Sequence, residues 1–97
     1  MSFNKNLFSE HLNNNDYNFC ISLLRNEIID IFTKRVQKRD SSFEYSTVSS
    51  LRKYVFKYLS DDEKEIMVAF QQLHFEEIPS YYELSRMMEL YKNLLEV

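Results

Sequence analysis

The residue types that most often carry out chemistry in enzymes are few in this chain and stand apart. His11 and His74 each lack a second histidine or cysteine at metal-ligand spacing. A single histidine near a helix end is more often a surface or capping group than a catalytic base. The only cysteine, Cys20, lies in an apolar run, where a buried and reduced thiol is expected. These residues predict neither a catalytic site nor a cofactor.

Four carboxylates stand close together in the sequence, at Asp61, Asp62, Glu63 and Glu65. Asp61 and Glu65 are one helical turn apart and could in principle bind a hard cation. Carboxylates in the first turn of a helix are also stabilised by the helix dipole, which gives them a structural reason to be there. Calcium loops need more oxygen ligands and usually a glycine, and the chain contains no glycine. We therefore expect no metal site.

The densest group of cations is the stretch KRVQKRD, residues 34–40. With the cations of the next predicted helix it gives a candidate basic patch of Arg35, Lys38, Arg39, Arg52, Lys53 and Lys57. Such a patch could contact nucleic acid or an acidic protein. It could equally complement residues 59–97, which carry nine acidic and three basic groups, within the bundle or across a dimer. The favoured interpretation is structural, because cations in the last turn of a helix are stabilised by its dipole.

A second cluster combines aromatic and thioether side chains near the start of the last predicted helix. Its members are Tyr81, Tyr82, Met87 and Met88. At helical spacing such residues usually belong to the core, but they are also the adaptable, amphipathic groups that protein interfaces favour. Both interpretations hold if this helix packs inward on one side and against a second subunit on the other. The cluster is therefore our candidate interface.

The elements that must position these groups are predicted to be helices. The chain has no glycine and one proline, Pro79, which disfavours tight hairpins and phosphate-binding loops. Apolar residues recur at spacings of three and four in a short segment over 3–12 and in longer segments over 16–39, 46–59, 61–73 and 80–95. Connections of about five to seven residues suit antiparallel neighbours. The sequence predicts one all-α domain over 1–97, a small antiparallel bundle of four main helices plus a short N-terminal helix.

Helix starts carry specific signals. Asp16 or Asn15 can cap the second segment, and Ser46 or Thr47 the third. Ser60 with Glu63, and Ser80 with Glu83, match the capping-box pattern. The predicted core stripes of the last two helices are Ile66, Ala69, Phe70, Leu73, and then Leu84, Met87, Met88, Tyr91, Leu94 and Leu95.

Composition and hydropathy indicate how the chain associates and in which compartment it is expected. Hydrophobic residues make up 44 % of the 97 residues, and these include eight Phe and seven Tyr, more apolar material than one small core readily hides. Self-association is therefore expected. The first residues lack the apolar centre of a signal peptide, and no window reaches the length of a membrane span. We expect a cytoplasmic protein that does not contact a membrane.

The size and predicted hairpins are similar to those of HEPN toxins, a helical ribonuclease family. Their motif is an arginine followed four to six residues later by histidine, and no arginine precedes His11 or His74 at that spacing. The general size and architecture also resemble small helical regulators and bacteriocin immunity proteins, and the abundance of Asn, Lys, Ile, Tyr and Phe resembles AT-rich bacterial or phage coding. A helix-turn-helix over 61–95 is disfavoured because its second helix is net acidic.

The sequence thus predicts a non-catalytic, cytoplasmic, self-associating protein-interaction or regulatory bundle. One alternative is a small nucleic-acid-binding regulator that uses the basic 34–57 region. The other is an immunity or antitoxin-type protein that neutralises a partner protein.

Overall fold

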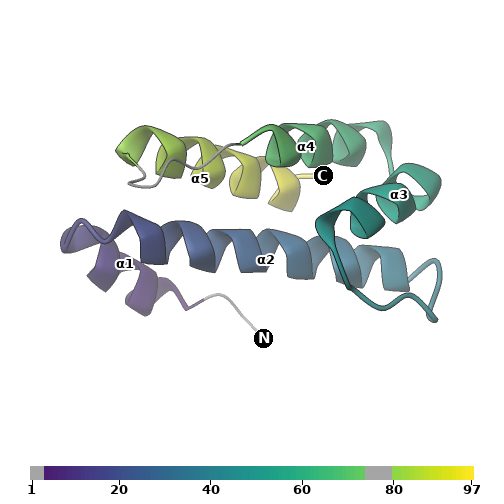
Figure 1. Cartoon of the computed structure of the whole chain (residues 1–97), viewed down its shortest axis with the longest axis horizontal. Coiled ribbons are helices and arrows are strands. Elements are labelled where there is room, and N and C mark those ends of the chain that lie inside the picture. The colour runs from purple at the N-terminus through teal and green to yellow at the C-terminus, as the bar shows by residue number, and fades with distance from the viewer. Residues whose placement is uncertain (1–3, 74–79) are drawn as a thin grey trace.

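The computed structural model of the chain describes residues 4–73 and 80–97. Within them the backbone forms five α-helices and no strand (Figure 1): α1 (Lys5–Asn13), α2 (Tyr17–Gln37), α3 (Val48–Tyr58), α4 (Asp61–Gln72) and α5 (Tyr81–Leu95). The predicted all-α bundle with a short N-terminal helix is confirmed. Phe3, predicted in the first helix, and Pro79, the one proline, lie outside the described residues.

Helix α2 is the centre of the bundle. It packs against α1, α3 and α5, while α4 packs against α3 and α5. Figure 1 shows α1 folding back along α2 and α4 running opposite to α5. Helices α2 and α5 run in the same direction, because the rings of Tyr17 and Tyr81 at their starts are 5.9 Å apart and Arg35 bonds to Leu94 near their ends. The crossing helix α3 and the returning helix α4 make this parallel pairing possible.

The predicted helix starts are confirmed in their side-chain contacts. A side-chain oxygen of Asp16 accepts from the Phe19 N–H at 3.2 Å, and that of Thr47 accepts from the Ser50 N–H at 3.1 Å. Ser60 accepts from the Glu63 N–H at 3.3 Å, while the Glu63 carboxylate accepts from the Ser60 N–H at 3.0 Å. These bonds satisfy backbone donors that a helix leaves without internal partners.

The second capping box follows the same pattern. The Glu83 carboxylate accepts from the Ser80 N–H at 2.7 Å and also from the Ser80 hydroxyl. These hydrogen bonds hold the pKa of Glu83 below its ordinary value. The box fixes where α5 begins, and therefore where the tyrosines of its first turn lie.

Replacing Ser60 with alanine tests the contribution of the first capping box. We expect the variant to lose about 1 kcal/mol of unfolding free energy, because the Glu63 N–H loses its acceptor. The matched control is Ser22→Ala, the same change at an exposed position inside α2, which we expect to be neutral or slightly stabilising. Urea denaturation followed by circular dichroism measures both. Equal effects in the two variants would contradict a capping role.

The core is one continuous cluster between the helices, but its membership differs in places from the predicted stripes. Met67 and Leu90 are buried although neither was predicted, because α4 and α5 each contact two neighbours and so bury a wider face. Phe43, which lies between the helical segments predicted over 16–39 and 46–59, is buried with its ring 4.6 Å from that of Tyr54. Leu95 was predicted in the core and is 56 % exposed, because it is the last residue of α5. Ala69 and Leu73 are half-buried.

The turn between α1 and α2 shows how a chain without glycine reverses direction. Asn15 adopts a φ of 59°, in the left-handed region that glycine usually occupies. Asparagine tolerates this conformation better than most residues. The Asp16 N–H donates to the His11 carbonyl at 2.9 Å across the turn. The predicted helical segments over 3–12 and 16–39 are thus joined by a short turn that places the end of α1 beside the start of α2.

Candidate functional site

Within the described residues, His11 and Cys20 are engaged in structural contacts. The His11 Nδ1 and an Asp16 carboxylate oxygen are 3.0 Å apart, and the imidazole stacks on Phe19 with ring centroids 3.7 Å apart. Asp16 also caps α2, so His11 joins the end of one helix to the start of the next. His74 lies outside the described residues.

Cys20 is fully buried, as the sequence indicated, and its thiol donates to the Phe8 carbonyl at 3.6 Å. Burial raises the pKa of this thiol, and the charge of Asp16 raises it further. The thiolate is the nucleophilic form, so this environment suppresses reactivity. Cys20 therefore packs α1 on α2.

The carboxylates of the first turn of α4 do not converge. Asp61 lies 3.5 Å from the ammonium of Lys64, whereas Glu63 turns inward to Arg35. No group of three or more histidine, cysteine or acidic side chains in residues 4–73 and 80–97 is arranged to hold a metal ion. The polar groups of this region are used to cap α4 and to join it to α2.

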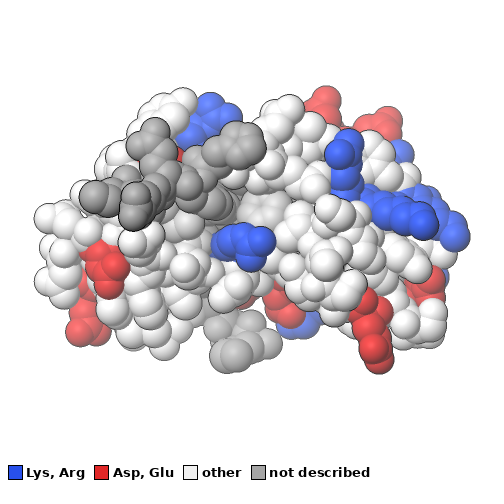
Figure 2. Space-filling view, in the orientation of Figure 1, with Lys and Arg blue, Asp and Glu red and all other residues white. Residues whose placement is uncertain are grey.

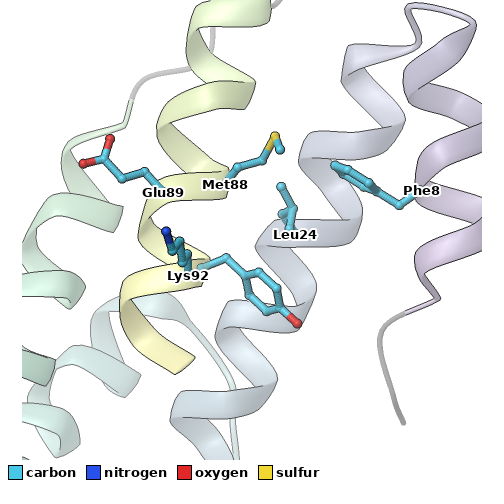
Figure 3. A pocket seen from close by; sticks show the side chains of 6 residues that line it. Phe8, Leu24, Met88, Glu89 and Lys92 are labelled. Carbon is cyan, nitrogen blue, oxygen red and sulfur yellow. The ribbon is translucent and has the colours of Figure 1, made fainter. Parts of the chain in front are cut away.

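An apolar groove lies between α1, α2 and α5, with a volume of about 410 Å³. In Figure 3, Phe8 on α1 and Met88 on α5 both reach toward Leu24 on α2, whereas Glu89 points away from them. Tyr91 and Lys92 complete the lining. Burial raises the pKa of the Tyr91 phenol, and the charge of Glu27 adds to this effect. The groove therefore presents mainly apolar surface beside the exposed face of α5, with Glu89 and Lys92 at its margin.

The four predicted interface residues separate into two groups. Tyr81 and Tyr82, in the first turn of α5, are 54 % and 67 % exposed. Met88 is half-buried and lines the groove. Met87 is fully buried in the core, where a partner cannot touch it. The structure thus brings Tyr81, Tyr82 and Met88 to the surface and assigns Met87 to packing.

An exposed stripe along α5 was not recognised from the sequence. Tyr81, Met88 and Leu95 are seven residues apart, two helical turns, and so lie along one side of the helix. Tyr81 and Leu95, at its ends, are both more than half exposed. We call these three residues the α5 stripe. The seven-residue spacing was a signal available in the sequence, but Leu95 had been placed in the core.

The six predicted basic residues also separate. Arg35 turns inward, and its guanidinium donates to Glu63 at 2.8 Å and to the Leu94 carbonyl at 2.9 Å. The other five are exposed: Lys38, Arg39, Arg52, Lys53 and Lys57. Figure 2 shows Lys and Arg side chains gathered at the end of the molecule where α3 lies, with acidic side chains beside them. Arg35 complements the acidic half of the chain within the bundle, whereas α3 offers its cations to solvent.

Comparison with protein-family models, with curated proteins and with solved structures finds no match to this chain. None of the helices in the described part of the chain has the length and apolar character needed to cross a membrane.

Proposed function

We propose that this chain is a non-catalytic protein-interaction module of the cytoplasm that self-associates through α5. The observation that carries the proposal is the α5 stripe, in which Tyr81 and Leu95 are more than half exposed and the half-buried Met88 between them lines the groove. Single exposed apolar residues are ordinary on protein surfaces. A row that continues into an apolar groove is the kind of surface that protein interfaces use.

A second copy of the chain is the occupant that the spacing of the stripe favours. Tyr81 and Leu95 are each seven residues from Met88, on opposite sides of it. In an antiparallel pair of α5 helices with Met88 at the two-fold axis, each Tyr81 lies opposite the other copy's Leu95. Two-fold dimers with one self-complementary patch are the commonest homo-oligomers. The aromatic and aliphatic ends of the stripe are therefore complementary to each other.

The chemistry of the remaining groups supports a non-catalytic role. His11 is held between Asp16 and Phe19, and Cys20 is buried with a raised pKa. A buried, protonated thiol also suits the reducing conditions of the cytoplasm. These contacts give both residues a function in joining α1 to α2.

Charged substitutions in the α5 stripe test self-association. We expect the wild-type chain to be dimeric in analytical ultracentrifugation, and Tyr81→Asp or Leu95→Asp to raise the dimer dissociation constant at least about tenfold, because a carboxylate would be buried without a partner. The matched control is Tyr45→Asp, the same change at a tyrosine 40 % exposed in the α2–α3 connection, which should leave the dimer intact.

Two results would contradict the proposal. A wild-type chain that stays monomeric at high concentration would rule out self-association. Dimers that tolerate both stripe substitutions, with folded variants shown by circular dichroism, would place the contact elsewhere. Met87 is unsuitable for this experiment, because a charge at its fully buried position would unfold the bundle rather than report on an interface.

A further inference from the structure

The outer face of α3 carries cations and one aromatic ring. Arg52, Lys53, Phe56 and Lys57 are exposed, while Leu51 and Val55 on the opposite side are fully buried. The helix sequence VSSLRKYVFKY contains no acidic residue. Phe56 is 40 % exposed, an unusual position for a phenylalanine unless something covers it. This face lies away from the α5 stripe and needs a separate explanation.

A groove of about 540 Å³ runs beside this face, between α3 and α4. Phe56 forms its α3 side, and Val68 and Ala69 contribute apolar surface from α4. The Arg52 guanidinium carbon lies 4.9 Å from the centre of the Phe56 ring, a distance at which a cation is attracted to the ring face. Arg52 is thereby held at the margin of the groove, where it can meet an anionic group on a bound molecule.

The cations near this groove differ from Lys34 and Arg35 on α2, which are both paired. Lys34 pairs with Asp30 at 2.9 Å, and Arg35 pairs with Glu63 at 2.8 Å. Within residues 4–73 and 80–97, no carboxylate lies within ion-pair distance of Arg52 or Lys53. These two charges are thus available to a partner. Carboxylates of the partner that pair with them would make the contact more specific.

The acidic residues of the groove indicate which class of partner fits. Asp61 and Glu65 line its α4 side, with Lys64 between them. A nucleic-acid backbone carries negative charge along its whole length and would be repelled there. A protein helix can place carboxylates on the α3 side only, and an apolar side chain between Phe56 and Ala69. The uneven charge of the groove therefore favours a protein.

We infer that the α3–α4 groove binds an amphipathic helix of a partner protein, with apolar residues against Phe56 and carboxylates against Arg52 and Lys53. The contact is independent of self-association through α5, because it uses a different pair of helices. A chain with both surfaces is a dimer that presents two equivalent grooves to acidic helices.

Synthetic peptides test this inference with the full-length chain. The first probe is a fluorescein-labelled 18-residue helix with leucines at positions i, i+3, i+4 and i+7 and glutamates along one flank. The second has the same composition in scrambled order, and the third probe is a 20-nucleotide oligothymidylate. Fluorescence anisotropy at low and moderate salt gives the dissociation constant of each. We expect the amphipathic peptide to bind at least tenfold more tightly than either of the others.

Variants locate the contact. We expect the double substitution Arg52→Glu with Lys53→Glu to weaken peptide binding at least tenfold, and Phe56→Ala to weaken it about as much at both salt concentrations. The matched control for charge is Lys5→Glu with Arg86→Glu, two exposed cations on α1 and α5, which should leave the peptide affinity within twofold. Circular dichroism checks that every variant is folded.

Four outcomes would overturn the inference. If the amphipathic peptide did not bind, the inference would be wrong. If the scrambled peptide bound equally well, the binding would be non-specific charge attraction. Tighter binding of the oligothymidylate would assign the face to nucleic acid. If the affinity for the peptide were unchanged in Phe56→Ala, the peptide would bind somewhere other than the α3–α4 groove.

Discussion

Replacing Phe32 with alanine is expected to lower the free energy of unfolding by about 3–5 kcal/mol, the largest effect expected of any truncation to alanine in this chain's tests. Phe32 is fully buried and stands on α2, the helix that packs against α1, α3 and α5. Truncation removes apolar contacts and leaves a cavity that the surrounding helices close only in part. Domains of this size are stable by about 5–15 kcal/mol, so the variant should retain only a fraction of the native stability.

The matched control is Phe56→Ala, the same truncation at an exposed position on α3. Phe56 is partly covered and stacks with Arg52, so we expect a loss of at most about 1.5 kcal/mol. Urea denaturation followed by circular dichroism compares the two variants. Similar losses would contradict the central position of Phe32. A small loss at Phe56 would also show that the bundle does not depend on this ring, which leaves the ring available to a partner.

Helix starts were predictable from the sequence because they depend on contacts over three residues. Asp16, Thr47, Ser60 and Ser80 each interact with the residue three positions later, and the sequence shows both members of each pair. The existence and order of the helices followed from these signals and from apolar spacing. Local chemistry therefore accounts for most of what was predicted correctly.

The core was less predictable because burial depends on how many neighbours a helix has. Met67 is buried because α4 packs against both α3 and α5, a fact that spacing within α4 does not contain. Phe43 lies in a connection without helical periodicity, yet Tyr54 and the Gln37 side chain hold it in place. Leu95 continues an apolar stripe beyond the point where other helices cover it. These outcomes are properties of the assembled bundle.

In the candidate surfaces, too, local features were predictable from the sequence and long-range contacts were not. The cations of α3 could be placed on an exposed face from their spacing, and they are exposed. The inward turn of Arg35 depends on partners 28 and 59 residues away. The charge distribution along the sequence allowed the basic half to complement the acidic half within the bundle, but it did not distinguish Arg35 from the other cations. The packing of α2, α4 and α5 determines that Arg35 is the cation that contacts the acidic half.

Arg35 leads to the second large prediction. Its guanidinium joins α2 to Glu63 on α4 and to the Leu94 carbonyl on α5, and the two charged side chains are only 23 % and 13 % exposed. We expect Arg35→Ala to lower the free energy of unfolding by about 2 kcal/mol, because the Glu63 carboxylate and the Leu94 carbonyl both lose a charge-assisted hydrogen bond. Urea denaturation at neutral pH measures the change.

The neighbouring cation provides a matched control. Lys34 pairs with Asp30 at 2.9 Å, one turn earlier on the same helix, but both side chains are largely exposed. Pairs of this kind contribute little, so Lys34→Ala should cost no more than about 0.5 kcal/mol. If the two alanine variants lost equal stability, the contact between Arg35, α4 and α5 would have no special role.

The pH dependence of stability distinguishes the Glu63 contact from general packing. Burial raises the pKa of Glu63, but hydrogen bonds from the Ser60 N–H, Arg35 and the Ser60 hydroxyl outweigh it, and the net pKa lies below its ordinary value. A depressed folded-state pKa means that the stabilisation is complete above the unfolded value, about 4.3, and is lost as the pH falls through the folded value. Glu63→Gln should therefore be less stable than wild type at pH 7.

The difference between wild type and Glu63→Gln should shrink as the pH is lowered below about 4, because wild-type Glu63 then becomes protonated and the glutamine does not titrate. Denaturation of both proteins from pH 7 to pH 3 measures this convergence. A difference that stays constant across the range would show that the glutamine disturbs packing and that the charge itself contributes nothing. Convergence would establish that Arg35 and Ser60 stabilise the junction of α2 and α4 through the ionised form of Glu63.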